Sequence, residues 1–218
     1  MKNRVDPAAT VEDVAFADVA ALAEPVAVAR PAASFTPESR FVRVVGYAAA
    51  FGRADGEPCN CNKGASPGSG PEAYVDLHVR LVPTAADVTL WKSEPWLAIT
   101  AEATPRLMSA SCRDALLGGS TVAEADGLAT LQRRGIAGAT GQVRLTGYLF
   151  ADDDKGEDSA HDREDGGGKR LTVWEVHPLF RIETCSTQTP CEATTDRGWV
   201  SLWSAGSGAA GLDRCDGT

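Results

Sequence analysis

The 218-residue chain is acidic, with a formal net charge of −9, and 43% of its residues are hydrophobic. That hydrophobic share is large enough to form a core, which excludes a chain that is disordered throughout. The charge argues against a nonspecific nucleic-acid binder, because such affinity comes from Lys and Arg displacing counterions. No apolar run approaches the roughly 18 to 20 residues that cross a bilayer, and residues 1–10 lack the apolar core of a signal peptide. We therefore expect a soluble protein.

The first 40 residues predict an arm rather than part of the folded domain, because they are rich in Ala and Pro. Thr10 followed by Asp13 predicts a short helix over residues 11–23, which Pro25 ends. From residue 41 the composition changes. Residues 41–52 are rich in β-branched and aromatic residues around a glycine, which predicts a kinked strand.

Two further strands follow a loop at residues 53–72, whose Gly, Pro, Ser and Asn content is typical of a connection. Residues 73–83 alternate most clearly: the apolar positions point inward, and Asp76 and His78 point outward. Residues 96–104 repeat the pattern more weakly, with Glu102 on the outward face. The segment 109–134 holds helical pieces broken by glycines, and it accommodates one short helix or two.

The last two strands are expected at residues 141–153 and 170–185, with Glu175 and His177 sharing the outward face of the final strand. Between these strands lies a long acidic loop that carries His161. The segment after residue 185 is rich in Gly and Ser but contains Trp199, Trp203 and Cys215. We expect it to pack on the domain as an extra strand or an anchored coil.

This order of elements is that of an OB fold. The sequence predicts an all-β domain with a short helix, built as a five-stranded, antiparallel, OB-like barrel over residues 41–185. Residues 1–40 are the N-terminal arm of this arrangement, and residues 186–218 are a tail packed on the barrel. Fold alone does not give function.

The chain also contains six cysteines, an even number that is compatible with three disulfides in an oxidising compartment. Their spacing matches no common zinc knuckle, which favours disulfides or plain thiols over thiolate metal ligation. Cys185 and Cys191 are candidates for a disulfide, although the sequence does not give the connectivity. The cysteines favour secretion and the missing signal sequence favours the cytoplasm, so the compartment stays open.

An internal similarity relates two parts of the predicted barrel. RVVGY at 43–47 resembles RLTGY at 144–148, and each is followed about 30 residues later by an acid-x-His motif, at Asp76-x-His78 and Glu175-x-His177. Strands that bend sharply in a barrel need a glycine, which explains the repeated glycine. It does not explain the repeated acid-x-His.

The repeated motif predicts a shared polar face. In an OB barrel the third strand runs between the second and the fifth, so Glu102 is expected between the two acid-x-His pairs, on an outer surface beneath the acidic loop. Imidazole and carboxylate groups together bind Zn, Mn or Fe, and carboxylates also tune histidines to titrate near neutral pH. The plainer interpretation is a set of ordinary cross-strand pairs, each worth roughly 0.2–1 kcal/mol.

With Asp76-Leu77-His78, then Glu102, then Trp174-Glu175-Val176-His177-Pro178, the chain resembles a loosely defined set of uncharacterised bacterial proteins. In that set an Asp-x-His strand is followed by a strand ending in an acid and later by an acid-x-His-Pro strand. The resemblance spans about residues 41–183. It implies an OB-like barrel and no established activity, and the long acidic loop of this chain departs from it, so it gives His161 no role.

Three functional hypotheses follow. The first is a binding module whose site residues engage a small ligand, a glycan or a protein, with a cationic partner favoured by the acidic field; those residues are Asp76, His78, Glu102, Glu175 and His177. The second is a metal-dependent hydrolase, acting for example on phosphodiesters, with His78, His177 and Glu175 as ligands of a divalent metal and Glu102 or Asp76 as general base. The third is a structural domain stapled by disulfides.

Overall fold

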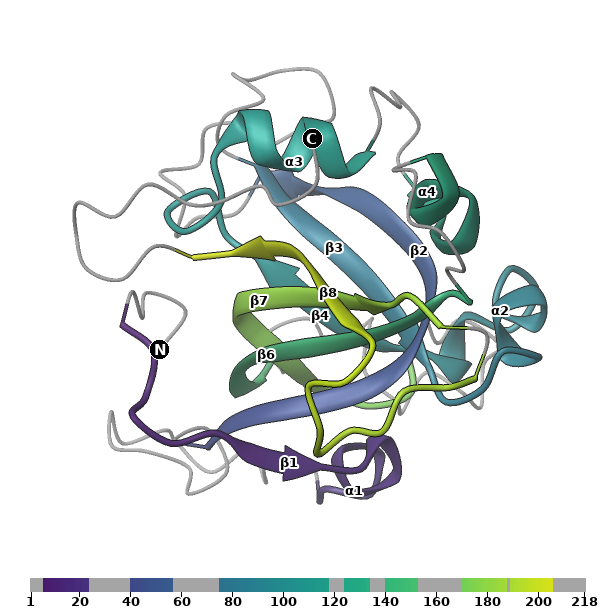
Figure 1. Cartoon of the computed structure of the whole chain (residues 1–218), viewed down its shortest axis with the longest axis horizontal. Coiled ribbons are helices and arrows are strands. Elements are labelled where there is room, and N and C mark those ends of the chain that lie inside the picture. Colours follow the sequence, from purple (N-terminus) through teal and green to yellow (C-terminus); the bar gives the residue numbers. More distant parts are fainter. Residues whose placement is uncertain are drawn as a thin grey trace.

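The computed structural model describes residues 6–23, 40–56, 75–117, 124–133, 140–152, 170–187 and 189–205. Strands are the commonest element among these residues, and a few short helices lie at the periphery (Figure 1). The predicted loop at 53–72 lies almost wholly outside this range, as do His161 with its acidic loop, and Cys59, Cys61 and Cys215. In the described part of the chain no helix is long and apolar enough to cross a membrane.

The centre of the molecule is a closed barrel of five strands, in the order β2-β3-β4-β7-β6, which closes through pairing of β2 with β6. The predicted OB-like, all-β barrel is therefore confirmed. The barrel is mixed rather than wholly antiparallel, because β4 and β7 run parallel and the other neighbours run antiparallel. The barrel strands are β2 (Phe41–Gly56), β3 (Val75–Val82), β4 (Ile99–Ala103), β6 (Gln142–Ala151) and β7 (Trp174–Cys185).

The strands form where β-branched and aromatic residues alternate with other types, and the apolar positions fill the barrel. The core side chains are almost fully inaccessible to solvent, among them Val44, Phe51, Leu77, Val79, Ile99, Ala101, Leu145, Leu149 and Val176. Trp174 and Trp203 are also buried in this core. They pack as core residues.

The parallel contact between β4 and β7 is short. Ala101 and Val176 are the single pair in register there, whereas β3 and β4 pair at five positions from Leu77 with Ala103 to Leu81 with Ile99. A further backbone hydrogen bond joins the Leu171 N–H to the carbonyl oxygen of Ala98, at 2.7 Å. Side-chain contacts therefore carry much of the closure between β4 and β7.

The N-terminal arm forms a strand where a helix was expected. β1 (Glu12–Val14) pairs parallel with β2, and α1 (Phe16–Ala20) covers only the second part of the predicted helix. The strand is favoured because Asp13 and Glu12 reach arginines on and beside β2: Asp13 accepts hydrogen bonds from Arg43, and Glu12 accepts them from Arg40. These contacts overcome the local helix preference of the arm.

Two short helices occupy the segment in which one or two were expected. α3 (Ala110–Leu117) begins where the Ser109 hydroxyl accepts a hydrogen bond from the Cys112 N–H, and α4 (Gly127–Arg133) begins where Asp126 accepts one from the Ala129 N–H. Between them β5 (Glu124–Asp126) pairs with β2. Upstream lie α2 (Asp87–Leu90) and the 3₁₀ turn η4 (Pro95–Leu97), so β4 starts three residues later than predicted.

The glycines of the repeated RVVGY and RLTGY motifs allow neighbouring backbones to approach closely. A Cβ on Gly46 would lie 2.8 Å from the carbonyl oxygen of Val82, and a Cβ on Gly147 would lie 2.5 Å from that of Pro178. The two motifs also pair with each other across β2 and β6, with Val44 opposite Leu145. The glycine part of the repeat thus has a packing explanation.

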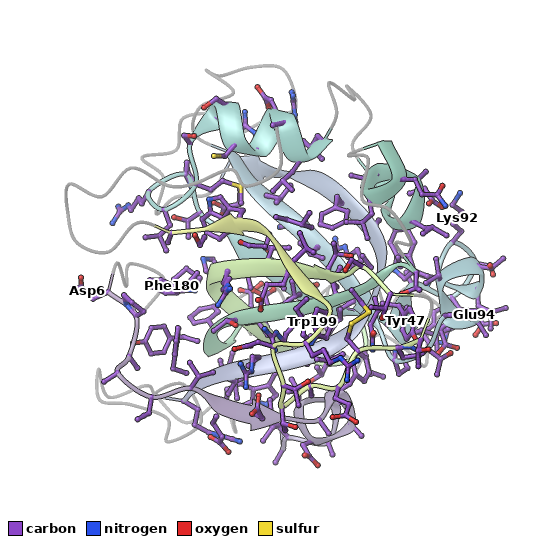
Figure 2. All side chains as sticks on the ribbon, viewed as in Figure 1. Asp6, Tyr47, Lys92, Glu94, Phe180 and Trp199 are labelled. Carbon is purple, nitrogen blue, oxygen red and sulfur yellow. A yellow bond between two sulfur atoms is a disulfide. The ribbon has the colours of Figure 1, made fainter. Side chains whose placement is uncertain are left out.

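The C-terminal segment is anchored by a strand, a disulfide and a buried arginine. β8 (Trp199–Ser204) pairs with β7, and Cys185 and Cys191 form a disulfide, which lies beside the labelled Trp199 in Figure 2. Cys112 is disulfide-bonded as well. Arg144 is fully buried and stacks over the Trp199 ring at 4.8 Å. We use the name Arg144 cluster for Arg144, Glu183 and Asp196, which are joined by ion pairs.

Candidate functional site

Backbone register places the predicted site residues on neighbouring strands. His78 on β3 is directly opposite Glu102 on β4, and the next residue back on β4, Ala101, is in register with Val176 on β7. Because side chains alternate along a strand, Glu102 shares its face with Glu175 and His177, the neighbours of Val176. Strand β4 therefore does run between the two acid-x-His strands. We call Asp76, His78, Glu102, Glu175 and His177 the histidine–carboxylate cluster.

Glu102 is the centre of the cluster, since its two oxygens contact two different histidines. Oε1 lies 2.5 Å from His78 Nε2, and Oε2 lies 2.8 Å from His177 Nδ1. The same His177 nitrogen is 3.7 Å from Glu175 Oε2. The ring of Phe150 packs edge-on against the His177 imidazole with their centroids 5.7 Å apart, and gives the cluster an apolar wall.

The cluster is buried, which corrects the predicted outer surface. The side chains of His177, Glu175 and Glu102 are 0%, 2% and 4% exposed, and Asp76 is fully buried. Only His78 retains some exposure, at 19% of its side chain. A polar side chain facing away from the core normally indicates a solvated face, and that expectation is wrong here. Large partners therefore cannot contact most of the cluster.

The close contacts do not amount to a complete hydrogen-bond network. The two imidazole–Glu102 contacts are short, yet the ring N–H directions do not align with the carboxylate oxygens. His177 Nε2 is buried and makes no hydrogen bond or ion pair with any residue that the structure describes. Buried polar groups are almost always paired, so an unpaired nitrogen here requires an explanation.

Three members of the cluster converge as metal ligands would. Asp76, Glu102 and His177 each offer one donor atom, and the three atoms lie within 4.8 Å of one another. The donors come from β3, β4 and β7, so the barrel itself fixes their spacing. Of the predicted ligand set His78, His177 and Glu175, only His177 belongs to this convergent group.

Arg170 and Asp152 complete the surroundings, and neither was predicted from the sequence. Arg170 Nη1 lies 2.5 Å from Glu175 Oε1 and 3.3 Å from Asp152 Oδ2, and Nη2 donates to the Asp152 carbonyl oxygen at 2.7 Å. The three residues are all buried. Asp152 and Arg170 flank the two ends of the acidic loop, and Glu175 is the second residue of β7. The only sequence signal for this contact was the arginine itself, at the first residue of the predicted strand 170–185.

Electrostatics within the cluster favour ionised Glu102 beside protonated His177. Burial raises the pKa of the Glu102 carboxyl, but the charges of His78 and His177 outweigh burial and hold that pKa well below its ordinary value. Burial lowers the pKa of His177, yet the Glu102 and Glu175 carboxylates outweigh it and raise the pKa to about 10. Burial and the Glu102 charge raise the pKa of Glu175. The carboxylates around His177 thus favour a positive charge at the centre of the cluster.

Comparison with known proteins adds no assignment. No family model, no curated protein and no solved structure matches the chain.

Proposed function

We propose that this protein is a small-ligand binding module and that the ligand is a divalent transition-metal ion bound by Asp76, Glu102 and His177. The observation that carries the proposal is the convergence of these three buried donors within 4.8 Å, next to a His177 nitrogen that has no partner among the described residues. The burial of the cluster disfavours the glycan and protein partners considered from the sequence. An ion is small enough to enter such a site and it satisfies several donors at once.

The donor set favours a transition metal over Ca²⁺ or Mg²⁺. Imidazole with carboxylate suits Zn²⁺, Fe²⁺ or Mn²⁺, whereas Ca²⁺ and Mg²⁺ prefer oxygen donors alone. The ion must also displace a proton from His177, whose pKa is about 10. At pH 7 this displacement opposes binding by about 4 kcal/mol. Zn²⁺ binding to zinc-finger peptides, whose ligands include thiolates, provides about 10–16 kcal/mol at that pH, so a site well short of that strength still outweighs this opposition.

The main competing explanation is a buried ion triad of His78, Glu102 and His177 without any ligand, in which protonated His177 neutralises Glu102. Such a triad satisfies the charges, but it leaves His177 Nε2 without a partner among the described residues. A hydrolase would in addition need a substrate to reach the ion. Among the five members of the cluster, only His78 is partly exposed to solvent. This enclosure favours the binding of an ion over the hydrolysis of a substrate.

Metal titration of the purified full chain tests the proposal. After treatment with EDTA and its removal, isothermal titration with Zn²⁺ and with Mn²⁺ should show one ion per chain for at least one metal. Glu102→Gln should weaken binding at least about 100-fold, more than the 10–100-fold typical of residues behind the ligands. Glu192→Gln, an exposed carboxylate on the C-terminal segment, is the matched control and should bind as the unmodified chain does.

Two results would contradict the proposal. One is the absence of stoichiometric binding for both metals in a folded protein. The other is a Glu102→Gln variant that binds as tightly as the Glu192→Gln control. Either result would leave the buried ion triad as the better description of the cluster.

A further inference from the structure

We infer that Arg170 determines which ions this site accepts, by holding the Glu175 carboxylate outside the coordination shell. The inference rests on the proposed metal site and deepens it. It concerns Glu175, a carboxylate that belongs to the cluster but not to the convergent donor group.

The guanidinium of Arg170 is fixed on several sides. It contacts Glu175 Oε1 at 2.5 Å and Asp152 Oδ2 at 3.3 Å, and it donates to the Asp152 carbonyl oxygen at 2.7 Å. Arg170 and both partners are buried. A charge-assisted contact between buried groups is strong, because water does not compete for either partner. Arg170 therefore fixes the direction in which the Glu175 carboxylate points.

Glu175 is nevertheless close enough to reach a bound ion. It precedes His177 by two residues on β7, so both side chains lie on one face, and its Oε2 is 3.7 Å from His177 Nδ1. The donors that converge within 4.8 Å in the described part of the chain are still Asp76, Glu102 and His177. The contact with Arg170 explains why Glu175 lies close to His177 but is not one of the three converging donors.

The chemical consequence is a choice between two kinds of site. With Glu175 held by Arg170, the protein offers two carboxylates and one imidazole, and the two negative charges balance a divalent ion. With Glu175 released, the site would gain a third carboxylate and an excess of negative charge, which suits hard cations that take oxygen ligands. Arg170 thus favours transition metals and disfavours Ca²⁺, and it acts as a specificity-determining residue.

A double-mutant cycle with Zn²⁺ and Ca²⁺ titrations tests this role. The unmodified chain should bind Zn²⁺ and show no measurable Ca²⁺ binding. Arg170→Met should tighten Zn²⁺ about tenfold, the value of one added charged contact, and should make Ca²⁺ binding measurable. Glu175→Gln alone should change Zn²⁺ affinity less than about threefold. The double variant, Arg170→Met with Glu175→Gln, should lose both the tighter Zn²⁺ binding and the measurable Ca²⁺ binding.

Arg181→Met is the matched control, because it removes the same charge from a half-exposed side chain of β7 that contacts Glu183 rather than the cluster. It should leave both affinities unchanged. The inference is overturned if Arg181→Met produces the same gain, if the gain persists in the double variant, or if Arg170→Met produces none. It is also overturned if Glu175→Gln alone weakens Zn²⁺ tenfold or more, since Glu175 would then be a ligand.

Folding of each variant is checked by circular dichroism. If Arg170→Met does not fold, Glu175→Gln alone decides, because its Zn²⁺ affinity separates a ligand from a carboxylate held aside. A chain that binds no Zn²⁺ or Mn²⁺ at all refutes the proposed function together with this inference. A chain that binds Zn²⁺ normally but shows no Arg170 effect refutes the inference only.

Discussion

Two ionic clusters among the described residues, each centred on buried charges, differ in how completely their members are paired. In the Arg144 cluster, Arg144 contacts Glu183 at 2.6 and 2.8 Å and Asp196 at 2.8 Å, and it donates to two backbone carbonyls of the C-terminal segment. In the histidine–carboxylate cluster, the contacts of Glu102 are equally short but unaligned, and a His177 nitrogen has no described partner. The hydrogen bonds of Arg144 are satisfied, whereas the histidine–carboxylate cluster retains a buried ring nitrogen without a partner among the described residues.

The two clusters also differ in the chemistry of their cations. A guanidinium keeps its charge at every accessible pH, so a carboxylate beside it is permanently neutralised. An imidazole can release its proton and then offer a lone pair to a metal. The difference indicates that the Arg144 cluster is suited to holding the chain together and the histidine–carboxylate cluster to exchanging a proton for an ion.

The largest expected effect on stability comes from removing Arg144 from the Arg144 cluster. Arg144→Met should lower the free energy of unfolding by about 3 kcal/mol, because among the described residues it leaves the buried Glu183 with only its ion pair to half-exposed Arg181. Urea denaturation measures the change. Replacing both partners, Arg144→Met with Glu183→Leu, should recover part of the loss. A single variant as stable as the unmodified chain would show that the two clusters do not differ in this way.

A smaller effect is expected from the pH dependence of the metal-free protein. His177 keeps its proton up to a pKa of about 10 in the folded state, and it loses the proton near its ordinary value of 6.5 when unfolded. The folded state therefore binds more protons between these values, and stability must fall as the pH rises. We expect a loss of about 2 to 3 kcal/mol between pH 7 and 9.

Urea denaturation at each pH in the presence of EDTA checks this dependence, with His177→Gln as the comparison. The variant lacks the titrating imidazole and should show a flatter profile. A profile for the unmodified chain that rises over this interval, or that the variant reproduces, would argue against a protonated His177 beside Glu102.

The smallest effect is expected at an exposed ion pair, which calibrates the buried ones. Glu12 accepts hydrogen bonds from Arg40, but the two side chains are 53% and 31% exposed. Glu12→Gln should change the free energy of unfolding by less than about 1 kcal/mol, since water competes for such pairs. A loss comparable to that of Arg144→Met would mean that burial does not separate the ion pairs of this protein.

Much of the arrangement could be predicted from strand alternation. The pattern in β3 assigns Leu77 inward and His78 to the other face, and the order of strands in an OB barrel places Glu102 between the two histidine strands. Both inferences use only local periodicity and a known strand order, and the contacts of Glu102 with His78 and His177 agree with them.

The burial of the cluster and the role of Arg170 could not be predicted in the same way. Periodicity tells which residues share a face, but it does not tell whether that face is covered, because the covering groups come from distant parts of the chain. The contact between Arg170 and Asp152 joins the two ends of a long loop, and no repeat or spacing marks it. The N-terminal helix was predicted too long because the pairing of β1 with β2 is likewise a distant interaction.

The single register pair between β4 and β7 means that an ion bound at the site would strengthen the contact between these two strands. Ala101 and Val176 are the single register pair between these two strands, and Glu102 and His177, the next residue on each strand, meet at 2.8 Å. An ion bound there would join β4 and β7 at the edge of the barrel that has the fewest backbone register pairs. Its binding energy would then appear as slower amide exchange along both strands.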